Sequence, residues 1–127
     1  FGGNPLAMAV AHPVLDVVNT KEFLAQVQQT ALRFKQRLAE LKDRHSSVIA
    51  EVRGEGLLMG LRMVPPAAAM VDELRAEKVL APTAGDNVVR LLPPLIAGEE
   101  EISYAVDAID RACTRLAQLH APKKGAA

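Results

Sequence analysis

Apolar side chains recur at alternating steps of three and four residues between positions 24 and 41. They are Leu24, Val27, Ala31, Phe34, Leu38 and Leu41. This spacing puts them on one face of an α-helix of about six turns, with charged side chains on its other faces. Asn19 and Glu22 predict where the helix starts, because they have the spacing of a capping box. Such a helix needs an apolar surface to cover, and the rest of the chain has to supply one.

The composition allows one hydrophobic core and argues against several classes of protein. The chain has 127 residues, half of them hydrophobic, with 15 basic and 15 acidic side chains. Zero net charge and the lack of a basic cluster argue against nucleic acid as a partner. No apolar run approaches the roughly 20 residues of a membrane helix, so no membrane partner is expected. The single cysteine, Cys113, cannot form an internal disulfide, which suits a cytoplasmic protein.

Two pairs of short apolar segments interrupt the helical pattern. Residues 48–52 and 57–64 flank an Arg-Gly-Glu-Gly sequence, and their length and bounding glycines predict two strands around a sharp bend. Residues 79–81 and 87–92 flank the turn-rich stretch 82–86 and predict two more strands. The middle of the chain therefore favours a small sheet.

Three further helices are expected. Asn4-Pro5 favours a helix start, and we expect a kink or a break at His12-Pro13, because proline removes a helical hydrogen bond. Pro65-Pro66 opens a short helix whose apolar side is predicted to hold Ala67, Met70, Val71, Leu74 and Lys78. Three glutamates favour the start of the last helix, at Glu99, Glu100 and Glu101. Its predicted apolar face comprises Ile102, Val106, Ile109, Cys113, Leu116 and His120.

This order of elements predicts an α+β (α/β) domain with a small, mostly antiparallel sheet covered by helices. We expect the domain to span residues 19–120. Residues 121–127 have too little apolar content to pack and are expected to be disordered.

Arg90 is the residue that most suggests chemistry, because it interrupts an apolar strand that should be largely buried. A guanidinium there needs a partner, and its planar fork matches a carboxylate through two parallel hydrogen bonds. A carboxylate ligand is thus one interpretation. An edge-strand arginine in water, or a structural ion pair, is the other, and the residues alone favour it.

The remaining candidates point to structure. Gly54 and Gly56 lack the third glycine of a nucleotide-binding fingerprint, so we expect a bend. No lysine is placed as a nucleophile, the histidines are scattered, and Cys113 fits an inert core position. The glutamates at 99–101 fit a helix start better than a metal site. No catalytic residue is predicted from the pattern.

Three sequence blocks resemble the C-terminal part of the class III pyridoxal-phosphate aminotransferases. They are Phe1-Gly2-Gly3-Asn4-Pro5-Leu6-Ala7, Glu51-Val52-Arg53-Gly54-Glu55-Gly56-Leu57-Leu58-Met59-Gly60 and Ala84-Gly85-Asp86-Asn87-Val88-Val89-Arg90-Leu91-Leu92-Pro93-Pro94-Leu95. The blocks occur in the family's order, and the last one is most similar to the family's acetylornithine branch.

The resemblance implies the small domain of a fold type I homodimer that moves an amino group to 2-oxoglutarate with pyridoxal 5'-phosphate. It implies that Arg90 binds a substrate carboxylate and that Gly2 and Gly3 lie near the site. Residues 1–18 would be a helical segment connected to the large domain. The lysine that carries the cofactor would lie upstream of Phe1, so the chain is expected to begin inside a longer polypeptide and to be inactive alone.

By the same resemblance, the substrates would be glutamate/2-oxoglutarate and N-acetylornithine, in arginine biosynthesis in the cytoplasm. The same domain from an ornithine, succinylornithine or 4-aminobutyrate aminotransferase stays an alternative. So does a binding or interaction module that has this fold but no catalysis.

Overall fold

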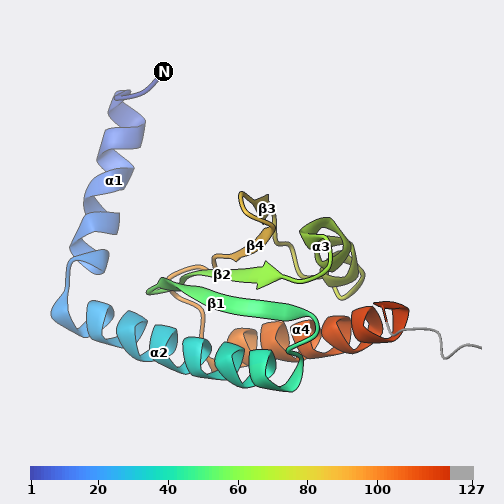
Figure 1. Cartoon of the computed structure of the whole chain (residues 1–127). Coiled ribbons are helices and arrows are strands. Elements are labelled where there is room, and N and C mark those ends of the chain that lie inside the picture. Colours follow the sequence, from blue (N-terminus) through green and yellow to red (C-terminus); the bar gives the residue numbers. More distant parts are fainter. Residues whose placement is uncertain (121–127) are drawn as a thin grey trace, which may run out of the picture.

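The computed structural model describes residues 1–120, which form four helices and one four-stranded antiparallel sheet (Figure 1). The elements are α1 (Pro5–Val18), α2 (Lys21–Arg44), β1 (Ile49–Glu55), β2 (Leu58–Met63), α3 (Ala67–Ala76), β3 (Thr83–Ala84), β4 (Val88–Leu91) and α4 (Glu99–His120). The strand order is β1-β2-β4-β3. Helices α2 and α4 cover one face of the sheet, and α1 projects away from it. The predicted α+β class is confirmed.

The face of α2 that the spacing identified is the face that packs on the sheet. Phe34, Leu38 and Leu41 are buried, whereas Leu24 stays exposed near the start of the helix. The strands contribute their inward side chains to the same core, and α4 contributes Ile102, Val106, Ile109, Cys113 and Leu116. Lacking tryptophan and nearly lacking aromatic residues, the core is built mainly from aliphatic and methionine side chains.

The predicted start of α2 is wrong by one residue. Thr20 is the N-cap, and its Oγ1 accepts a hydrogen bond from the Phe23 N–H at 3.3 Å. Asn19 instead ends α1, where its N–H donates to Leu15 O at 2.9 Å. Two residues separate the helices, so Asn19 closes the first and the residue after it caps the second.

Helix α1 starts as predicted but does not break at the proline. Asn4 Oδ1 accepts a hydrogen bond from the Ala7 N–H at 2.9 Å. The helix then continues through Pro13 to Val18. Proline's φ suits a helix, and the carbonyl of Ala9 that loses its partner belongs to an exposed residue that water can reach.

The glycine-rich bend is a β-hairpin, as expected, and no helix follows it. The tight loop between β1 and β2 has Gly56 at φ 58°, a conformation that glycine adopts without strain. Gly54, inside β1, has φ 128°, and a Cβ there would lie 2.2 Å from Leu58 O. Both glycines are therefore explained by backbone geometry.

The second predicted hairpin is shifted along the chain. Residues 79–81 form no strand, and β3 comprises Thr83–Ala84, inside the stretch predicted as a turn. The turn is carried instead by Asp86 at φ 63° and Asn87 at φ 55°, the residue types that best tolerate this region after glycine. The prediction of Lys78 on the apolar side of α3 is also wrong. Helix α3 ends before Lys78, and the side chain of Lys78 is exposed.

Helix α4 begins at the glutamates, as predicted. The Gly98 N–H donates to Glu101 Oε2 at 2.9 Å, and Glu99 Oε1 accepts from Arg37 at 3.2 Å. The side chain of His120 and the expected disorder of residues 121–127 lie outside the described residues. Over residues 1–120, every helix is too short or too polar to cross a membrane.

An ion pair joins the end of α2 to α4 and predicts an acid-sensitive contribution to stability. His45 Nε2 donates to Asp110 Oδ1 at 2.5 Å, and Arg44 donates to Asp110 Oδ2 at 3.0 Å. These bonds lower the pKa of Asp110 below its ordinary value of 3.8. The stabilisation is therefore present above the ordinary pKa and is lost as the pH falls through the lowered one.

Asp110→Asn should accordingly lower the free energy of unfolding at about pH 7. Acidification to about pH 2.5 should then reduce the free energy of unfolding less in the variant than in the wild type. Urea unfolding at the two pH values measures this. Asp16→Asn, on exposed α1, is the control and should behave like the wild type. Parallel losses in Asp110→Asn and wild type would contradict the prediction.

Candidate functional site

The sheet has a polar face opposite helices α2 and α4 (Figure 1). The antiparallel register pairs Arg53 of β1 with Gly60 of β2, and Gly60 with Arg90 of β4. Paired residues of neighbouring antiparallel strands share one face, so these three form a row across the sheet. The next row pairs Val52 with Leu61 and Leu61 with Val89, which lie on the core side. We call the surface of Glu51, Arg53, Gly60, Arg62 and Arg90 the polar face.

Arg90 lies on this face with an exposed side chain, between the buried Val89 and Leu91. The strand is largely buried, as expected, and Arg90 is its exposed position, because its side chain points away from the core. Strand β4 is internal to the sheet, so Arg90 is not an edge-strand residue. Its own N–H donates to Pro82 O at 2.9 Å, which holds the backbone firmly.

The other two arginines of the polar face are paired with carboxylates. Arg53 donates to Asp86 Oδ2 at 2.6 Å, and Arg62 donates to Glu51 Oε2 at 3.1 Å. The hydrogen bond from Arg53 lowers the pKa of Asp86, which stays ionised at neutral pH. Among residues 1–120, no hydrogen bond or ion pair engages the guanidinium of Arg90. It is therefore the free cation of this face.

Asn87 fastens the start of β4 to the elements around it. Its Nδ2 donates to Met63 O at 2.8 Å and to Pro65 O at 2.9 Å, and its Oδ1 accepts from the Ala67 N–H at 2.7 Å. The last bond caps α3, whose own N-cap residue is a proline without a capping side chain. The strand that carries Arg90 is thus paired along both sides and anchored by the residue just before it.

Sequence reasoning missed Arg53 and Gly60 as parts of the polar face. It also missed Asp86 and Asn87 as the residues that hold Arg53 and the start of β4. Strand periodicity alone could not place Arg53 and Arg90 on the same face. That placement also needs the pairing register, which the sequence does not reveal. The Asp-Asn pair before β4 was the available signal, because these residues favour turns with positive φ.

The other predicted positions lie apart from the polar face. Gly2 and Gly3 precede α1, at the end of that helix farthest from the sheet (Figure 1). The structure does not bring them to Arg90 within this chain, and their proximity to a site stays a prediction. Cys113 is buried, and burial raises the pKa of its thiol to about 12, which makes it unreactive as expected.

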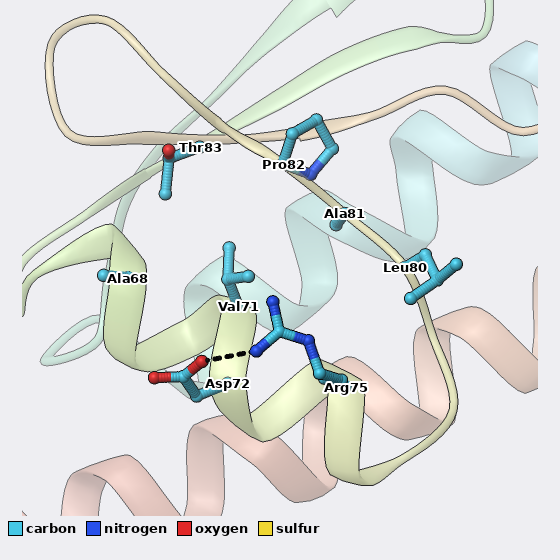
Figure 2. Close-up of a pocket in the computed structure, with 8 residues that line it drawn as sticks. All are labelled: Ala68, Val71, Asp72, Arg75, Leu80, Ala81, Pro82 and Thr83. Atoms are coloured by element: carbon cyan, nitrogen blue, oxygen red, sulfur yellow. Dashed lines mark hydrogen bonds and ion pairs between the residues drawn. The ribbon is translucent and has the colours of Figure 1, made fainter.

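A cleft of about 580 Å³ lies between α3 and residues 80–83 (Figure 2). Its lining is mostly apolar, from Val71, Leu80 and Pro82 among others. Figure 2 shows Arg75, the cation of this cleft, beside Asp72. The Arg75 guanidinium donates to Asp72 Oδ1 at 3.0 Å. Because its charges are satisfied, the cleft is a weaker candidate than the polar face.

Comparison with known proteins places the chain among aminotransferases. The model of the family described as "Aminotransferase class-III" matches residues 1–113. Acetylornithine aminotransferase 1 of Bradyrhizobium diazoefficiens and acetylornithine aminotransferase of Brucella melitensis are each 53% identical over 116 residues, 91% of this chain. The chain spans only 29% of the length of either relative.

Solved structures agree on the fold. N-acetylornithine aminotransferase of Stenotrophomonas maltophilia has a TM-score of 0.84 at 28% identity, covering 94% of this chain and 34% of its own. Ornithine aminotransferase of Toxoplasma gondii has a TM-score of 0.81 at 28% identity, covering 94% of this chain and 29% of its own. The match over residues 1–113 and the shared fold together show that the chain belongs to the class III aminotransferase family.

Proposed function

We propose that this chain is the C-terminal small domain of a pyridoxal-phosphate-dependent acetylornithine:2-oxoglutarate aminotransferase of arginine biosynthesis in the cytoplasm. The two relatives at 53% identity, both named acetylornithine aminotransferases, support N-acetylornithine as the amino donor. The observation that carries the proposal is the free guanidinium of Arg90, held on an internal strand beside arginines that are already paired.

Arg90 binds the carboxylate of glutamate and 2-oxoglutarate in this proposal. Its fork can donate two parallel hydrogen bonds, which fix the position and the plane of a carboxylate. Gly60, which pairs with Arg90 from β2, has no side chain that could cover the guanidinium or compete for the ligand. The anchored backbone of β4 fixes where the side chain of Arg90 begins, so only the side chain itself has to be ordered when a carboxylate binds.

The described residues do not themselves form a cradle for pyridoxal 5'-phosphate. A lysine that binds the cofactor covalently needs a site that lowers its pKa. Lys21, Lys35 and Lys78 are exposed, and Lys42 pairs with Asp43 at 3.6 Å. The cofactor, which supplies the electron sink for amino transfer when bound, is therefore assigned to other parts of the enzyme. What this chain contributes is the substrate carboxylate site.

The partners proposed are the large domain of the same protein and a second copy in a homodimer. Helix α1 supports this, because it has no buried residue although most of its side chains are apolar. An apolar cleft of about 400 Å³ lies beside it, lined by Val10, Pro13, Val14, Val17, Val18, Phe23, Leu95 and Ile96. A contiguous apolar surface of this kind is expected to be covered by another domain or subunit.

The test is amino transfer by the purified full-length protein, supplied with pyridoxal 5'-phosphate and 2-oxoglutarate. N-acetylornithine should be the best donor, with a kcat/KM about tenfold or more above those of ornithine, succinylornithine and 4-aminobutyrate. A higher value for one of the other donors would move the protein to that branch of the family. No transfer from any donor would favour a non-catalytic module.

A further inference from the structure

Arg53, which is paired with Asp86, lies in the same row of the sheet as Arg90, and only strand β2 separates the two arginines. Arg53 and Arg90 both pair with Gly60, from opposite sides. Two strand spacings put their Cα atoms about 10 Å apart. Two long side chains at that distance can reach the same small anion.

The side chain of Arg53 already crosses part of this gap. A Cβ on Gly60 would lie 3.6 Å from Arg53 Cγ, so the arginine stem passes beside the glycine. The guanidinium at its end is held by Asp86 at 2.6 Å, in the turn that leads into β4. The positive charge of Arg62 also contributes to lowering the pKa of Asp86. Asp86 thus offsets the positive charge of Arg53, whereas Arg62 has its own carboxylate partner in Glu51.

Removing that carboxylate would create a competitor for the substrate. A dicarboxylate such as 2-oxoglutarate could then place one carboxylate on Arg53 and the other on Arg90, or bind Arg53 alone. Either arrangement displaces the carboxylate from its productive position. Specificity of this kind comes from removing an alternative binding mode, without any new contact to the substrate.

We propose that Asp86 is a specificity-determining residue, which holds Arg53 and thereby leaves Arg90 as the single guanidinium of the polar face that takes a substrate carboxylate. The inference rests on the proposed function of Arg90. Asp86 would touch no substrate and would act by occupying Arg53.

The experiment compares Asp86→Asn with wild type in the full-length enzyme. Asparagine tolerates the positive φ of this position, so the variant removes charge with little backbone strain. Inhibition by excess 2-oxoglutarate and by succinate or glutarate should strengthen about tenfold or more, the size of a charge-assisted hydrogen bond to the released guanidinium. Asp86→Gly, which also fits the turn, should do the same and serves if the first variant is unstable.

Rescue separates this role from a structural one. The double variant Arg53→Gln/Asp86→Asn should regain the weak inhibition of the wild type, because the competing guanidinium is gone. Asp72→Asn is the matched control, since it frees Arg75 from an exposed ion pair away from the polar face. It should leave the inhibition unchanged.

Unchanged inhibition in Asp86→Asn and Asp86→Gly, or a change that persists in the double variant, would overturn the inference. A normal response to 2-oxoglutarate in an Arg90 variant would instead overturn the proposed role of Arg90. The two failures are therefore distinguished by different variants.

Discussion

Arg90→Lys in the full-length enzyme should lower kcat/KM for 2-oxoglutarate by about 30-fold to several thousand-fold. Losing one partner of a buried, hydrogen-bonded charge pair costs about 2–5 kcal/mol. Lysine keeps the charge but offers a point donor instead of a planar fork, so the plane of the carboxylate is no longer fixed. Steady-state kinetics with 2-oxoglutarate as the varied substrate measures the loss.

The fold should survive this change, because the side chain of Arg90 is exposed in the domain and contributes no ion pair within residues 1–120. The melting temperature and the absorbance of the bound cofactor should stay close to those of the wild type. Arg75→Lys, on the surface of α3, is the control and should leave the kinetics unchanged. Normal 2-oxoglutarate kinetics, or a failure to fold, would show that Arg90 has a structural role instead.

Gly54→Ala should have the largest effect on stability, about 3 kcal/mol or more in the free energy of unfolding. The new Cβ would lie 2.2 Å from Leu58 O and 2.8 Å from Met59 Cα. Both are backbone atoms of the paired strand, so β1 and β2 would have to move apart. Thermal or urea unfolding of the protein measures the change, and low soluble yield is expected to accompany it.

Gly56→Ala, two residues away in the same hairpin, is the matched control. Gly56 also has a positive φ, but a Cβ there meets no atom within 4 Å. The backbone penalty alone is about 1–2 kcal/mol. Equal losses for the two variants would show that steric contact with β2 is not what requires glycine at position 54.

Long, periodic elements could be predicted from the sequence, and the reason is that burial of one face dictates their pattern. The spacing of Phe34, Leu38 and Leu41 identified the face of α2 that packs, and the apolar face of α4 was found in the same way. The hairpin at Gly54 and Gly56 was predictable because few other residues adopt its conformation. Local patterns of this kind need no knowledge of the partner segment.

Features that depend on pairing between distant segments could not be predicted. The shift of β3 into the stretch predicted as a turn reflects its pairing with β4, where Thr83 lies opposite Val89. The polar face depends on the register that aligns Arg53 with Arg90 through Gly60. Arg90 alone was recognisable, because a charge inside an apolar strand is conspicuous without any partner.

The two outer edges of the sheet limit how copies of this protein can associate. At one edge, β3 is only two residues long and follows Pro82, so it presents few backbone groups to an incoming strand. At the other, β1 carries Glu51, Arg53 and Glu55, and Lys35 Nζ donates to Gly54 O at 3.3 Å. Short edges and charged edges both discourage strand addition and the fibrous aggregation that follows from it. Strand addition is thus disfavoured at both edges of the sheet, whereas the apolar side chains of α1 stay exposed in this chain.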